Sequence, residues 1–181
     1  MSEQHTGPHE LGRRIALLPF QNPNLKSFIR DELVLLDRLE VPHIRYHEER
    51  VILCVAATAF AIRAYLPAGD LSDEVSSGFA TLLRDYGASA PERQTTVQLL
   101  QRRVGDYGYA ATMELWPLPE RPSRGLADEF ALVLSEHSRN DQIDIRTARD
   151  LAERYVVQLW HQEVRNVGLA MKAAGLPIEE R

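Results

Sequence analysis

Two histidines and their neighbouring carboxylates are the side chains in this sequence best suited to chemistry. His43 and His47 are four residues apart, so on a helix their imidazoles would lie on one face and could bind a transition metal together. Glu40 precedes His43 at the Glu-x-x-His spacing of di-iron helical bundles. Pro42, however, interrupts a helix between these two residues. The pattern therefore favours a solvated, charged first helical turn over a metal site.

The remaining candidate ligands lie in the C-terminal half. His137 follows a glutamate, and His161 stands between Trp160 and the sequence Gln-Glu163. Gln158 occupies the position at which a second di-iron motif would need a glutamate. We interpret these histidines as structural. The alternative is a helical bundle that binds a metal or cofactor through residues from several helices: His43, His47, His137, His161 and Glu163. No cofactor is predicted.

Recognisable catalytic and nucleotide-binding motifs are absent from the sequence. There is no Gly-x-Ser-x-Gly nucleophile motif, and Cys54 has no basic residue next to it to activate its thiol. Gly105 and Gly108 lack the spacing and the following lysine of a phosphate loop. The 21 basic residues are scattered and the net charge is −5, which argues against a nucleic-acid-binding face. The sequence thus favours a non-catalytic protein.

The strongest structural signal is residues 51–62, in which Thr58 is the only residue that is not apolar. A helix that is apolar on every side must be buried all round or lie in lipid. Twelve residues span only about 18 Å as a helix, too short for a bilayer, so no membrane contact is expected. We predict a buried central helix over 43–66. With a single buried Cys54 and a polar start to the chain, we expect a cytoplasmic protein.

Apolar periodicity predicts further helices around this central one, and therefore an all-α fold: a single compact bundle of about six helices. Asn24 is the expected N-cap of the first helix and Ser72 that of the third, while Asp144 should cap the last helix and Gly175 end it. A hairpin at residues 105–108 is an alternative to a continuous fourth helix. The other predicted helices are 25–40, 73–86, 91–115, 126–138 and 145–174, with a Pro-rich linker at 117–125.

The N-terminal residues 1–20 are predicted to lie outside the helical domain of residues 21–181. Residues 1–10 are expected to be flexible, and residues 15–18 are apolar but too short for a helix of their own. We expect a short strand, or an arm that docks on a groove of the same chain or of a second subunit. The long last helix, together with this arm, predicts a homodimer.

Function is predicted from these surfaces. The first hypothesis is a protein-interaction or regulatory domain, such as an adaptor, a small subunit or an immunity-type inhibitor; the metal- or cofactor-binding bundle is the second. Aromatic residues near the linker form either a binding patch or a cover for the open end of the bundle. The predicted partner-binding residues are Ile15, Leu17, Leu18, Tyr107, Tyr109, Trp116 and Leu118. The partner is another protein or a second copy of the chain.

Overall fold

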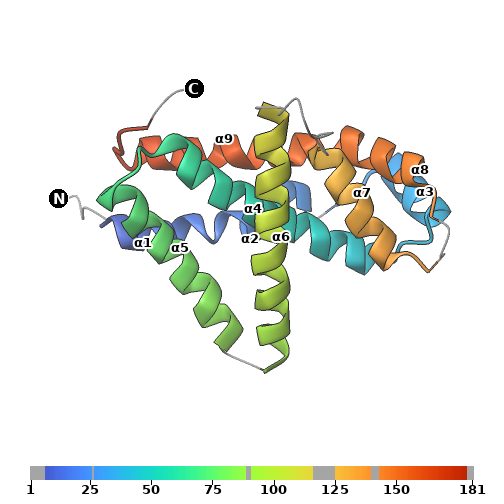
Figure 1. Ribbon diagram of the computed structural model, residues 1–181, viewed down its shortest axis with the longest axis horizontal. Helices are drawn as coiled ribbons and strands as arrows, with labels where there is room; N and C mark the ends of the chain where they lie inside the picture. Colours follow the sequence, from blue (N-terminus) through green and yellow to red (C-terminus); the bar gives the residue numbers. More distant parts are fainter. Residues whose placement is uncertain (1–6, 26, 89–90, 116–124, 140–142, 179–181) are drawn as a thin grey trace.

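The computed structural model describes residues 7–25, 27–88, 91–115, 125–139 and 143–178, and every regular element in these ranges is helical (Figure 1). This confirms the predicted all-α bundle. The elements are α1 (Pro8–Ile15), α2 (Leu18–Gln21), a 3-10 turn (Pro23–Leu25), α3 (Arg30–Arg38), α4 (His43–Tyr65), α5 (Asp70–Ala88), α6 (Pro91–Leu115), α7 (Leu126–His137), α8 (Ile145–Leu151), a π-helical turn (Ala152–Val156) and α9 (Val157–Ala173). None of the helices is long and apolar enough, over its described residues, to cross a membrane.

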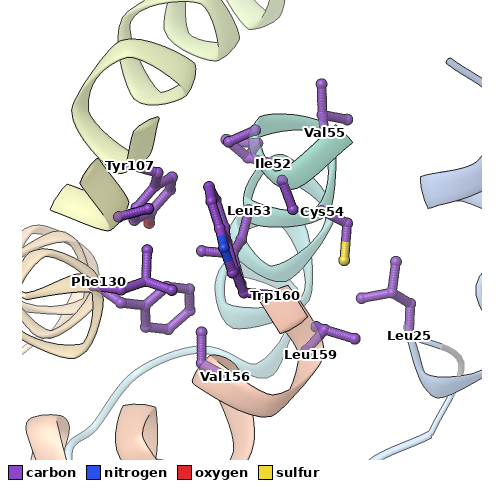
Figure 2. Close-up of a cluster of buried hydrophobic side chains, with 14 of the residues drawn as sticks. Leu25, Ile52, Leu53, Cys54, Val55, Tyr107, Phe130, Val156, Leu159 and Trp160 are labelled. Carbon is purple, nitrogen blue, oxygen red and sulfur yellow. The ribbon is translucent and has the colours of Figure 1, made fainter. Parts of the chain in front are cut away.

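Helix α4 is central, as predicted. Helix α9 runs beside it and α6 crosses it (Figure 1). Figure 2 shows side chains from three other helices around α4: Tyr107 of α6, Phe130 of α7, and Leu159 and Trp160 of α9. Cys54 is fully buried in this cluster. Burial raises the pKa of its thiol, and the nearby Glu163 carboxylate raises it further, so the thiol stays protonated and inert.

The N-terminal segment differs from the prediction, because residues 8–15 form helix α1 rather than a strand or an extended arm. Pro8 occupies its first turn, where a proline costs no hydrogen bond. Leu11 and Ile15 lie on one face and are buried, and α1 packs against α5. A helix of this length is marginal alone, so packing on α5 supplies the stability that local sequence lacks.

The helix predicted over 25–40 is shorter than expected. Its first turn is replaced by the 3-10 turn and extended chain, and α3 begins at Arg30. Asn24 is therefore not its N-cap; instead the backbone N–H of Ile29 donates to the Glu32 carboxylate (3.2 Å). Helix α5 begins earlier than predicted, at Asp70, so Ser72 lies inside the helix rather than at its cap. In both cases a short polar residue resembled a helix N-cap, but the helix begins at another residue.

The last two predicted helices and the fourth were placed correctly. Helix α6 continues through Gly105 and Gly108, so the hairpin alternative is wrong. The segment predicted as 145–174 forms α8, the π-helical turn and α9 without a break. Asp144 caps it by accepting a hydrogen bond from the backbone of Arg146 (3.0 Å), and Gly175 ends it with φ of 76°. Most of the predicted linker, 117–124, lies outside the described residues.

Candidate functional site

A groove lies between three helices whose residues are far apart in the sequence. Its floor comes from α4 and its walls from α5 and α6, which project together from the layer of α4, α7 and α9 (Figure 1). The cavity volume is about 340 Å³. We call it the α4–α6 groove, and its described lining is Ala59, Ile62, Arg63, Ser76, Phe79, Ala80, Leu83, Arg84, Leu100, Gln101 and Val104.

The lining is apolar at its base and basic at its edges. Ile62, Phe79 and Leu100 are buried in the base of the groove. Arg63 and Arg84 are exposed and form no ion pair with any residue that the structure describes. No carboxylate belongs to the described lining. The described lining therefore combines an apolar surface with two exposed guanidinium groups.

Helix α1 holds the α5 wall from behind through close backbone contact. Gly12 of α1 and Gly78 of α5 lie where the two helices meet. A Cβ on Gly78 would lie 1.9 Å from the carbonyl oxygen of His9, and a Cβ on Gly12 would lie 2.0 Å from that of Val75. Only glycine permits this approach, because a Cβ at either position would meet backbone atoms. A change of side-chain rotamer could not relieve that clash. The predicted docking arm is thus a brace for one wall of the groove.

A buried polar cluster holds the α6 wall. Arg103 and Tyr107 lie on a face of α6 next to the groove face, and both reach Glu49 of α4. The Tyr107 hydroxyl donates to Glu49 Oε1 at 2.8 Å, and Arg103 Nε lies 3.8 Å from the same oxygen. Arg103 also donates to Glu136 of α7, and His137 Nε2 lies 3.4 Å from Glu49 Oε2. Three helices are therefore tied together by one carboxylate.

The electrostatics of this Glu49 cluster favour a structural role. Burial raises the pKa of Tyr107, and the charge of Glu49 and the hydrogen bond to it raise it further. Burial alone would lower the pKa of Arg103, but the hydrogen bond to Glu136 and the charge of Glu49 outweigh it, so the pKa is raised. Tyr107 thus stays a donor and Arg103 stays charged. A phenol and a guanidinium fixed in these forms position helices but do not exchange protons.

A second buried cluster fixes the chain before α3. The Tyr46 hydroxyl donates to Glu32 Oε1 at 2.5 Å, and Arg50 Nη1 lies 3.5 Å from that oxygen. Arg50 Nη2 donates to the carbonyl of Asn24 at 2.6 Å, and its guanidinium lies 5.1 Å from the centre of the Phe28 ring. Burial is the main cause that raises the pKa of Tyr46. Arg50 thereby anchors the 3-10 turn and Ser27, which precede α3, to α4.

The third buried carboxylate belongs to Glu163 of α9. Asn22 Nδ2 donates to Glu163 Oε2 at 2.9 Å, and Thr58 Oγ1 lies 3.5 Å from Oε1. Burial raises the pKa of Glu163, although hydrogen bonds from these two residues and from Asn166 lower it in part. The carboxyl group joins the residue after α2 to α4 and α9, without a cation beside it among its described contacts.

Two of the five candidate metal ligands, His43 and His47, lie together beside the ring of Phe28 (ring centroids 6.3 and 6.2 Å away), and the other three lie elsewhere. His43 pairs with Asp37 (3.1 Å), His47 packs against the ring of Phe28, and His137 pairs with Glu49. His161 is exposed, while Glu163 points into the core. Within the part of the chain that the structure describes, no three histidine, cysteine or acidic residues are arranged to hold a metal ion.

The predicted partner-binding residues also divide into separate groups. Ile15 and Tyr107 are buried within their own chain, and Leu18 is half-buried. Leu17 is 41% exposed and Tyr109 is 55% exposed. Trp116 and Leu118 lie outside the described residues.

Sequence reasoning missed both the groove and the Glu49 cluster. Tyr46, Glu49 and Arg50 follow helical spacing just before the apolar run, which was a usable signal that this charged turn is partly buried. Arg63 and Arg84 offered no such signal, because isolated arginines at the edge of an apolar stripe are common on any helix surface.

Comparisons with known proteins returned no family model, no curated protein and no solved structure that matches this chain.

Proposed function

We propose that this chain is a non-catalytic protein-interaction domain that binds a segment of its partner in the α4–α6 groove. The observation that carries the proposal is the groove itself: an apolar cavity of about 340 Å³ edged by Arg63 and Arg84. Grooves between helices commonly bind an amphipathic segment through its apolar face. Helix α1, which packs on α5, and the Glu49 cluster, which holds α6, support the proposal. They fix the walls of the groove, and a preformed site loses less conformational entropy on binding.

The polar groups of the groove support binding rather than catalysis. They are Arg63, Ser76, Arg84 and Gln101, and the described lining places neither a carboxylate nor a histidine beside Ser76 to act as a base. The buried acids lie elsewhere, in clusters where hydrogen bonds already hold them. The metal- or cofactor-binding alternative has no comparable support, because its five residues do not converge in the described chain.

Blocking the groove should abolish partner selection. Ala80 is exposed on the α5 wall, so Ala80→Trp fills the cavity without disturbing the core. We expect a random peptide library displayed on phage to yield binders that recognise the wild-type protein and not Ala80→Trp. Ala173→Trp, at an exposed position near the end of α9, is the matched control and should retain them. Binders that recognise all three proteins equally would contradict the proposal.

Self-association in the cytoplasm is the second form of this proposal. Leu17 and Phe20, on either side of Pro19, are 41% and 45% exposed, and Leu169 on α9 is 56% exposed. We propose that a symmetric copy of the chain packs on Leu17 and Leu169, since two-fold dimers are the commonest oligomers. We expect light scattering after size exclusion to give the mass of a dimer, and Leu17→Glu/Leu169→Glu to give a folded monomer. A wild-type protein that is monomeric at micromolar concentration would contradict self-association. The proposal that a partner binds in the groove would then remain.

A further inference from the structure

The described lining of the α4–α6 groove is basic, whereas the chain as a whole is acidic. The protein carries 26 acidic and 21 basic residues, for a net charge of −5. The described lining nevertheless contains two arginines and no carboxylate. Arg13 and Arg149, by contrast, pair with nearby acids. Arg63 and Arg84 form no such pair with any described residue, so within the described part of the chain no carboxylate competes with an anion at the rim of this apolar surface.

The dimensions of the groove suit a short stretch of helix. Arg84 follows Ser76 by eight residues on α5, so this wall is about 12 Å long, which is roughly two helical turns. The volume of about 340 Å³ lies near the lower end of the range for small-molecule pockets. It accepts a few apolar side chains, one or two turns apart.

We infer that the partner segment is an acidic amphipathic helix. Its apolar side chains would pack on Phe79, Leu100 and Val104, at the base and walls of the groove. Its flanking carboxylates would pair with Arg63 and Arg84, which bind carboxylates through two parallel hydrogen bonds. This inference rests on the proposed function and adds the chemistry of the partner to it.

Charge complementarity distinguishes this partner from other occupants. A basic helix would place like charges beside Arg63 and Arg84, which is unfavourable at an interface. A fatty acid could satisfy one guanidinium with its single carboxylate, whereas a helix can satisfy both. A second copy of the chain would have to present a helix face with acids on both sides of an apolar stripe.

A pair of synthetic helices tests the inference. The probe is a stapled, fluorescently labelled peptide of about 15 residues, because shorter unstapled helices are marginal in water. It carries leucines at positions i, i+3 and i+7 and glutamates beside them; the matched peptide carries lysines in place of the glutamates. Fluorescence anisotropy measures binding of each to the full-length protein. We expect the acidic peptide to bind at least about tenfold more tightly than the basic one.

Charge reversal on the protein provides the matched control. Arg63→Glu/Arg84→Glu should weaken binding of the acidic peptide by about tenfold or more and strengthen binding of the basic peptide. Arg30→Glu/Arg165→Glu changes the net charge equally at exposed positions outside the groove and should leave both affinities nearly unchanged. Circular dichroism verifies that both variants are folded. The inference is supported if Arg63→Glu/Arg84→Glu binds the basic peptide more tightly than the acidic one, while Arg30→Glu/Arg165→Glu still prefers the acidic peptide.

Three outcomes would overturn it. If both peptides bind equally and neither binds Ala80→Trp, the partner need not be acidic. The groove would still be the interaction site. Binding that Ala80→Trp does not affect would contradict the proposed function itself. Saturable binding of decanoate, lost in Arg63→Glu/Arg84→Glu while neither peptide binds, would assign the groove to a small anionic amphiphile.

Discussion

Glu49→Leu is expected to lower the free energy of unfolding by about 3 to 5 kcal/mol. Glu49 is 1% exposed and Arg103 is 3% exposed, so removing the carboxylate leaves a buried guanidinium with only Glu136 as a charged partner. The Tyr107 hydroxyl also loses its acceptor. The desolvation of the Arg103 charge is then offset less, because its remaining partner Glu136 is an exposed carboxylate, and the loss exceeds what the ion pair itself contributes. Chemical denaturation followed by circular dichroism measures the loss.

A second replacement should restore most of this stability. Glu49→Leu/Arg103→Met removes both charges and fills their space with apolar atoms, a change that is often neutral for a buried pair. Glu153→Leu is the control, because Glu153 pairs with Arg149 at the surface and such pairs contribute about 1 kcal/mol or less. If Glu49→Leu were as mild as Glu153→Leu, the cluster would not hold α6 in place. If the double variant were no more stable than Glu49→Leu, the cost would not come from the buried charge of Arg103.

Gly78→Ala should cost about 1 to 3 kcal/mol, although the same substitution elsewhere in a helix usually stabilises it. The added Cβ would lie 1.9 Å from the carbonyl oxygen of His9, which is backbone and can only move with all of α1. We therefore expect α1 to separate from α5. Denaturation measures the loss of stability, and hydrogen exchange should show α1 losing protection before the other helices.

Gly105 of α6 provides the control, because its replacement by alanine should change the stability in the opposite direction. A Cβ on Gly105 would meet nothing within 4 Å, so Gly105→Ala should stabilise the protein by up to about 1 kcal/mol. A stabilising Gly78→Ala would mean that α1 does not pack on α5 as described. The sign of the effect, more than its size, thus separates a glycine required by helix packing from one that packing does not need.

The sequence determined those parts of the fold that depend only on residues close together in the chain. Residues 51–62 are apolar on every side, so the burial of α4 follows whichever helices surround it. Asp144 and Gly175 define the ends of the α8–α9 segment through hydrogen bonding and backbone conformation within a few residues. The apolar periodicity that predicted one helix over 91–115 likewise agrees with the continuous α6.

Tertiary structure decided the rest, because the deciding contacts join residues far apart in the chain. Helix α1 is too short to be stable without α5, so its formation depends on a glycine contact that periodicity does not reveal. Tyr107 and Glu49 are 58 positions apart, and Asn22 and Glu163 are 141 apart. A sequence shows that such side chains exist but not which of them share a buried site. The α4–α6 groove is likewise decided by how three helices diverge, which depends on their packing angles and the braces behind them.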